Sequence, residues 1–208
     1  MSRVQKIAVL GSGAWGTALA LAQSRAGRDV VLWSRSDETA SEINDQRTNA
    51  AYLPNIRFDA PFRATTESAD ALQGASAILA VIPAQSLREA LSAIGPHVPA
   101  NVPVVLCAKG IEKGTGLLMS AVLRQCLPAN PATALSGPSF AADVARGLPT
   151  AVTVAAEDLN MAGDLAAALS TPVLRCYSSD DLIGVEVGGA LKNVLAIAAG
   201  AVRGAGLG

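Results

Sequence analysis

The sequence predicts an α/β protein: a mostly parallel sheet with helices on both faces, followed by the first long helix of an all-α second domain. Strand-like and helix-like stretches alternate from residue 7 to residue 177. Several strand-like runs, such as residues 77–82, are apolar throughout, which is typical of strands covered on both faces. From Asp180 onward, one apolar helical stretch replaces the alternation. We therefore expect a first domain over residues 1–179 and the start of a second over residues 180–208.

The individual elements follow from apolar runs, helix-forming stretches and the residues that end them. The first strand covers residues 7–10 and leads into a helix rich in alanine and leucine. Pro83 ends the buried strand at 77–82, because proline has no backbone N–H to donate. The other expected strands are residues 29–33, 62–65, 102–108, 132–136, 150–155 and 173–177, and the other expected helices are residues 37–45, 67–73, 85–94, 116–126 and 158–169.

The strand at residues 7–10 runs directly into a Gly-x-Gly-x-x-Gly loop. Gly11 permits the tight turn out of the strand, Gly13 lets a pyrophosphate approach the backbone, and Gly16 lets the helix pack closely on the strand. The free amides and positive helix end at residues 13–17 then form an anion site. Such a loop also occurs in ordinary strand-to-helix turns, but here strand, glycines, helix and second strand come in βαβ order. The sequence therefore predicts a Rossmann-like dinucleotide-binding domain.

Composition and charge exclude several classes of protein. Half of the residues are hydrophobic but only 3% are aromatic, so we expect a core of alanine, valine, leucine and isoleucine. The net charge is −1, and neither a basic stripe nor a charged tail indicates a nucleic-acid or membrane-surface partner. The N-terminus enters the first strand directly, which leaves no room for a signal peptide.

The cysteines and the single histidine narrow the classes further. Cys107, Cys126 and Cys176 are far apart, fit a reducing cytosol and match no zinc site, which argues against zinc-dependent alcohol dehydrogenases. His97 lies in a Pro/Gly-rich loop, so dehydrogenases with a histidine acid/base and Ser-His-Asp hydrolases do not fit. We expect a cytoplasmic protein without a bound metal.

The apolar stretch at residues 182–202 is long enough to span a bilayer. Glu186 and Lys192 fall inside it and would be costly at that depth, so we expect a buried helix of a soluble protein and no membrane span. One long apolar helix cannot bury all its faces alone. We therefore expect either that the chain is the N-terminal part of a longer protein or that it forms a homodimer through this helix.

Cofactor choice depends on the end of the second strand, where a carboxylate would bind the ribose 2′-hydroxyl and favour NAD. This chain has Ser34, Arg35 and Ser36 there, and the first acidic residue after the strand is Asp37. Arg35 could face a 2′-phosphate with the two serines donating to it, which favours NADP over NAD. The alternative is a solvated loop arginine.

Two lysines are candidates for chemistry. Lys109 follows a buried strand, at the end where open α/β sheets bind ligands, and would suit an anionic substrate or an oxyanion. Lys192 is the only cation between residues 182 and 202, and burial there would disfavour its charged form, as a general acid/base requires. Glu186 would be its neighbour only if the helix bends at the two glycines between them. The alternative for both lysines is a side chain that reaches solvent.

Ser139 follows the strand at 132–136 and is a natural N-cap for a helix that begins near Ala141. Free amides at that point would offer a second anion site, unless the cap is purely structural.

Together these segments resemble the bacterial type of NAD(P)-dependent glycerol-3-phosphate dehydrogenase. The resemblance rests on the order and spacing of several motifs along nearly the whole chain. They are the glycine loop with Trp-Gly-Thr-Ala-Leu-Ala at 11–20, Leu-Trp-Ser-Arg at 32–35, Asn-Ala-Ala-Tyr-Leu-Pro at 49–54, Ala-Lys-Gly at 108–110, Ser-Gly-Pro-Ser-Phe-Ala at 136–141 and Gly-Gly-Ala-Leu-Lys-Asn-Val-Leu-Ala-Ile at 188–197.

The resemblance implies an oxidoreductase that interconverts sn-glycerol 3-phosphate and dihydroxyacetone phosphate with NAD(P)H and feeds glycerophospholipid synthesis. It makes Lys192 the proton donor/acceptor at the carbinol oxygen. The implied substrate residues are Lys109, Gly137, Ser139, Lys192 and Asn193, and the implied cofactor residues are Gly11, Gly13, Ala14, Trp15, Gly16, Arg35, Lys109 and Ala141.

Two other functions stay open at this point. One is a related lysine-dependent reductase of a hydroxy acid or a ketopantoate-like substrate, and the other is a non-catalytic nucleotide-binding module. Members of the resembled family also carry an acidic residue and an Arg-Asn pair in a longer helical domain. Because this chain ends before them, we expect it to bind nucleotide but to turn over poorly.

Overall fold

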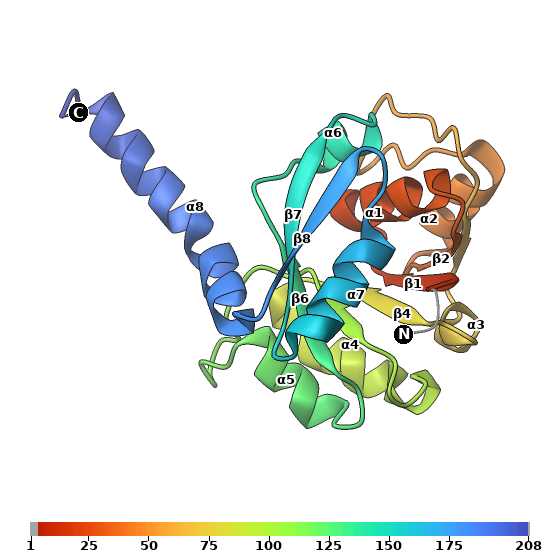
Figure 1. The fold of residues 1–208 in the computed structure, drawn as a ribbon. Coiled ribbons are helices and arrows are strands. Elements are labelled where there is room, and N and C mark those ends of the chain that lie inside the picture. The colour runs from red at the N-terminus through yellow and green to blue at the C-terminus, as the bar shows by residue number, and fades with distance from the viewer. Residues whose placement is uncertain (1–3, 208) are drawn as a thin grey trace.

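The computed structural model describes residues 4–207, and its centre is an eight-stranded sheet of order β3-β2-β1-β4-β5-β6-β7-β8 (Figure 1). Neighbouring strands are parallel except for the antiparallel pair β6 and β7. The strands are β1 (Lys6–Leu10), β2 (Asp29–Trp33), β3 (Arg63–Thr65), β4 (Ala77–Ala80), β5 (Val104–Leu106), β6 (Ala132–Ser136), β7 (Thr150–Ala156) and β8 (Leu174–Ser179). The predicted mostly parallel, Rossmann-like sheet is confirmed.

Helices cover both faces of this sheet. They are α1 (Ala14–Arg25), α2 (Asp37–Ser41), α3 (Ser68–Leu72), α4 (Leu87–Ile94), α5 (Met119–Cys126), α6 (Ala141–Ala145), α7 (Leu159–Leu169) and α8 (Leu182–Gly204). On β1, Ile7 and Val9 join the core under α1, α6 and α7, whereas Ala8 and Leu10 join the core under α4 and α5. This alternation explains why the central strands are apolar at every position.

The boundaries differ from the predicted ones mainly where a turn interrupts a helix-like pattern. The polar helix expected at 37–45 ends at Ser41 and continues as a π-helical turn, Glu42–Gln46. The helix expected from residue 116 starts at Met119, because Gly116 adopts φ +72° and a bridge joins Ile111 to Leu118.

The prediction that the apolar C-terminal helix is buried is wrong. α8 leaves the sheet domain and extends away from it (Figure 1). Leu182 and Glu186 are buried near its start, but Ile183 is 63% and Ile197 74% exposed. The first turns pack on β6 and β7, and nothing in residues 4–207 forms a second layer over the rest. Burial of an apolar helix depends on such a layer, which its own sequence does not supply.

By length and composition α8 could cross a membrane. It has 23 residues, with a mean hydropathy of 1.6 in its most apolar window, and 11% of that window is buried. Within residues 4–207 it is the one helix of this kind.

Candidate dinucleotide and substrate site

The glycine loop has the geometry that the sequence predicts. Gly11 adopts φ +117°, where a Cβ would also collide with the carbonyl oxygen of Val81, and a Cβ on Gly16 would collide with the carbonyl oxygen of Gly11. In contrast, no atom of residues 4–207 lies within 4 Å of a Cβ on Gly13, apart from its chain neighbours. Gly13 is the N-cap of α1, so the first amides of this helix have no intrahelical acceptor. The loop therefore leaves room and donors for an anion.

Asn49 stabilises the glycine loop through side-chain hydrogen bonds, a role that the sequence analysis did not predict. Its side chain is fully buried, and its Nδ2 donates to the carbonyl oxygen of Ser12 at 2.8 Å and to Thr17 Oγ1 at 2.9 Å. Thr17 Oγ1 also donates to the Ser12 carbonyl. The signal was present in the sequence, since Asn49 begins the Asn-Ala-Ala-Tyr-Leu-Pro motif, but that motif alone assigns it no contact.

A cleft of about 340 Å³ lies beside the loop, at the carboxyl ends of the central strands. It brings together five predicted site residues from three segments of the chain. They are Ala14, Trp15, Lys109, Ser139 and Ala141, and the remaining lining residues are Val81, Ile82, Pro83, Cys107 and Ala108. Burial raises the pKa of the Cys107 thiol well above its usual value, so this cysteine is an unreactive part of the wall.

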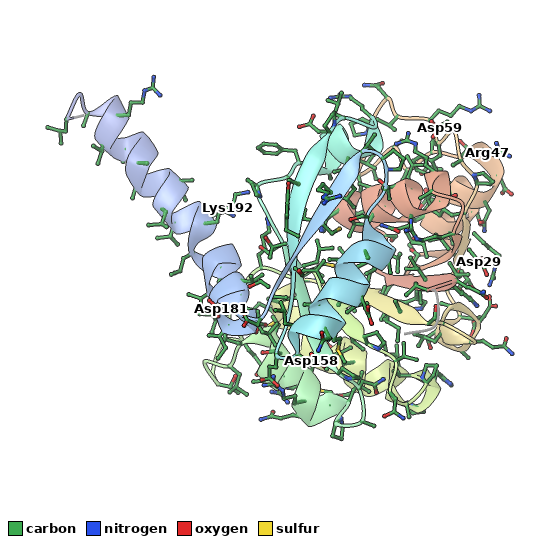
Figure 2. All side chains as sticks on the ribbon, in the orientation of Figure 1. Asp29, Arg47, Asp59, Asp158, Asp181 and Lys192 are labelled. Atoms are coloured by element: carbon green, nitrogen blue, oxygen red, sulfur yellow. The ribbon has the colours of Figure 1, made fainter. Side chains whose placement is uncertain are left out.

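Lys109, which follows β5, lines this cleft, and Lys192 of α8 lies close to it. Lys109 Nζ donates to the carbonyl oxygen of Gly137 at 3.3 Å. Partial burial of its ammonium group, together with the nearby Lys192, lowers the pKa of Lys109 below 10.5. Lys192 lies along α8 on the side that faces the sheet domain (Figure 2), with Nζ 5.9 Å from the ring centroid of Phe140.

The surroundings of Lys192 differ from the expected apolar pocket. Lys192 is half-buried. The apolar residues that follow it on α8 are exposed, Val194 to 60% and Leu195 to 67%, so they form no apolar pocket around it. Asn193 is exposed as well and does not line the cleft.

Glu186 does not pair with Lys192. Its carboxyl group accepts hydrogen bonds from the backbone N–H of Ser120 at 2.8 Å and from Ser120 Oγ at 2.5 Å. It therefore faces the start of α5.

The N-cap predicted at Ser139 is wrong. α6 begins at Ala141, as expected, but its N-cap is Phe140, which has no polar side-chain atom. The Ser139 N–H instead donates to the Gly137 carbonyl in a tight turn. This turn leaves the Ser139 side chain among the lining residues of the cleft.

The serines beside Arg35 are engaged within their own loop. Ser34 is buried, and its hydroxyl hydrogen-bonds to Ser12 Oγ at 2.9 Å and to the Ser36 carbonyl at 3.1 Å. Ser36 Oγ accepts from the Thr39 N–H and caps α2. Ser34 Oγ is therefore committed within the loop, Ser36 Oγ serves as the acceptor of the α2 cap, and Arg35 is the exposed side chain at the end of β2.

Within residues 4–207, no three His, Cys, Asp or Glu side chains are placed to hold a metal ion together.

The strand–glycine loop–helix unit and the cleft at the carboxyl edge of a parallel sheet define a Rossmann-type dinucleotide-binding protein. A family model described as the N-terminus of NAD-dependent glycerol-3-phosphate dehydrogenase matches residues 6–162. The model for the C-terminus of the same enzyme matches residues 181–208. The chain belongs to the NAD-dependent glycerol-3-phosphate dehydrogenase family.

Individual relatives agree with this assignment. The NAD(P)+ glycerol-3-phosphate dehydrogenase of Chelativorans sp. (strain BNC1) is 64% identical over 208 residues, covering 100% of this chain and 64% of the relative. The enzyme of Mesorhizobium japonicum is 61% identical over 203 residues, which cover 98% of this chain and 59% of the relative. The crystal structure of the Coxiella burnetii glycerol-3-phosphate dehydrogenase superposes with a TM-score of 0.88 at 38% sequence identity. The match covers 98% of this chain and 62% of the Coxiella chain. The chain thus spans about three fifths of the length of these relatives.

Proposed function

We propose that this chain forms the cofactor-binding part of an NAD(P)-dependent glycerol-3-phosphate dehydrogenase, together with the first residues of its substrate site. The reaction is the interconversion of sn-glycerol 3-phosphate and dihydroxyacetone phosphate, which feeds glycerophospholipid synthesis. The observation that carries the proposal is that Lys192 lies close to Lys109, which lines the cleft beside the glycine loop. A non-catalytic nucleotide-binding module has no need for this pair.

In this mechanism each residue has a role that follows from its position in the site. A bound nicotinamide supplies or accepts the hydride. The first amides of α1 hold the pyrophosphate over Gly13, where the structure leaves open space. In the reductive direction Lys192 Nζ gives a proton to the carbinol oxygen, and in the oxidative direction its neutral amine takes that proton back. Lys109 holds the anionic substrate, with Gly137 and Ser139 at the wall of the site and Asn193 next to Lys192.

NADP is the proposed preferred cofactor, with NAD also accepted. Arg35 is exposed at the end of β2, where it can reach a 2′-phosphate. Asp37, the first carboxylate after β2, accepts a hydrogen bond from Thr66 Oγ1 at 2.7 Å and is thereby held toward β3. This arrangement favours a phosphate over a free 2′-hydroxyl.

We place the dinucleotide-binding domain at residues 1–179 and the start of a helical substrate domain at residues 180–208. The separate family matches at 6–162 and 181–208 support this division. In this proposal α8 belongs to a cytoplasmic protein and does not span a membrane, because Glu186 and Lys192 tie its first half to the sheet domain. The exposed apolar residues of α8 would be covered by further helices of the substrate domain or, in a homodimer, by a second copy.

Tryptophan fluorescence tests the proposal. Trp15 lines the cleft, and Trp33 ends β2 with its Nε1 bonded to the Thr66 carbonyl. We expect saturable quenching by NADPH and by NADH, tighter for NADPH, and a further change with dihydroxyacetone phosphate but not with ketopantoate. A folded chain that shows no quenching with either nucleotide would contradict the proposed function. A response to ketopantoate alone would favour the hydroxy-acid reductase alternative.

A further inference from the structure

One face of α8 attaches the helix to the sheet domain through residues 182, 186, 189 and 192, which lie on one side of a helix at this spacing. Leu182 is 2% exposed and packs with Ala134 and Ala155 of β6 and β7. A Cβ on Gly189 would lie 2.9 Å from Ser136 Oγ and 3.7 Å from Lys109 Cγ. Helix α8 therefore touches the domain closely up to the turn that carries Lys192.

The strongest polar attachment on this face is the carboxyl group of Glu186. Glu186 is 8% exposed and Ser120 is 3% exposed, so both hydrogen bonds between them are shielded from water. Ser120 lies in the first turn of α5, where backbone N–H groups have no intrahelical acceptor. Leu118, at the N-cap of α5, has no polar side chain to accept them. Glu186 supplies from another helix the acceptor that α5 lacks.

The Glu186–Ser120 hydrogen bonds join the helix that carries Lys192 to the segment of the chain that contains Lys109. The segment that begins with Lys109 continues through the turn bridged by Ile111 and Leu118 and ends at Ser120. Glu186 thus fixes α8 to the far end of that segment, while Gly189 packs against Lys109 at its near end. Two attachments on one helix determine both its rotation and its axial position, so the location of Lys192 relative to Lys109 follows from them.

We propose that Glu186 is a positioning residue whose hydrogen bonds to Ser120 hold Lys192 beside Lys109. The inference rests on the proposed function, in which these lysines serve the reaction. Glu186 itself touches neither cleft nor cofactor space; it acts through the placement of α8. Its loss leaves the buried Ser120 N–H unpaired, which favours a shift of α8 away from α5.

The test uses the ammonium titrations of the chain itself, followed by NMR after ¹³C-dimethylation of its lysines. In the wild type, partial burial and the nearby Lys192 hold the pKa of Lys109 below its ordinary value. In Glu186→Ala we expect the Lys109 midpoint to rise toward 10.5, with NADPH affinity changed by less than about twofold, because the glycine loop is untouched. Glu186→Gln keeps one acceptor oxygen and is expected to lie between the two.

Glu157→Ala is the matched control, because Glu157 also binds α5, accepting from Arg124 at 2.6 Å, but on the exposed surface. It is expected to leave the Lys109 titration unchanged. If Glu186→Ala does not fold, Ser120→Ala removes the hydroxyl bond alone and is expected to shift Lys109 in the same direction. An unchanged Lys109 midpoint in the folded Glu186 variants would overturn the positioning role. Failure of the wild type to bind nucleotide would contradict the proposed function alone, because the lysine titration does not depend on it.

Discussion

Lys109 and Lys192 lie close enough for Lys192 to lower the pKa of Lys109, although one follows β5 of the sheet and the other lies on α8. Two ammonium groups side by side repel each other unless an anion lies between them. The fold therefore maintains an arrangement that is unfavourable in the empty protein and becomes favourable when an anion lies between the two ammonium groups. A cleft cation whose pKa is lowered by burial and by a second nearby cation is a physical mark of a functional site.

The first prediction concerns pH and Lys109. Because the folded-state pKa of Lys109 lies below the ordinary 10.5, the unfolded chain binds more protons between those two values. The contribution of Lys109 to the free energy of unfolding should therefore increase as pH rises through this window. In Lys109→Met this contribution disappears, and affinity for dihydroxyacetone phosphate falls. Urea unfolding of both proteins from pH 7 to pH 10.5 measures the difference, and parallel curves would refute the prediction.

The second prediction separates two glycines of one loop. Gly16→Ala forces a methyl group against the carbonyl oxygen of Gly11 and should destabilise the protein by about 2 kcal/mol. The corresponding fall in Tm is about 4–8 °C. Gly13→Ala fits the backbone at φ −67° and ψ 178° and should leave Tm unchanged. The same methyl occupies the space proposed for the pyrophosphate, so NADPH affinity should fall by about tenfold or more. Equal Tm losses in the two variants would count against this division of roles.

The third prediction concerns Asn49. Asn49→Ala removes both side-chain bonds to the glycine loop and should cost about 1–3 kcal/mol of stability. Because the loop is then less well held, NADPH affinity should fall about tenfold. Asn44→Ala is the matched control, since Asn44 also makes two side-chain bonds, both to the Ala64 backbone, outside the loop. Loss of nucleotide affinity in both variants to the same degree would show that general destabilisation is responsible.

The fourth prediction tests cofactor choice at Arg35. Arg35→Ala should weaken NADPH binding about tenfold, because one charge-assisted contact to the 2′-phosphate is lost. NADH has no phosphate at that position, so its affinity should change less than about twofold. Arg203→Ala, at the far end of α8, controls for the loss of one positive charge. Fluorescence titration measures the affinity of the wild type and of each variant for both nucleotides, and an equal loss for both nucleotides in Arg35→Ala would rule out recognition of the 2′-phosphate by Arg35.

Much of the site could be predicted from the sequence because it depends on short-range rules. The glycines of the loop follow from backbone angles and close approaches that exclude a side chain, as the positions of Gly11 and Gly16 show. The position of Lys109 follows from its place after a buried strand. In contrast, Ser139 matched the pattern of an N-cap, but Phe140 stands at the N-cap of α6 and the Ser139 N–H donates to the Gly137 carbonyl in a tight turn. Which residue takes the N-cap position here depends on local geometry that residue preferences do not encode.

By itself, the sequence determined the parallel sheet, the glycine loop and the strand-end position of Lys109, because apolar runs and glycine requirements act over a few neighbouring residues. Only the tertiary structure decided the exposure of α8, the partner of Glu186 and the support of the glycine loop by Asn49. Each of these depends on contacts between residues far apart in the chain. Whether an apolar helix is buried, or which donor a carboxyl group meets, is determined by how the elements pack, and the pattern within one segment carries no information about that.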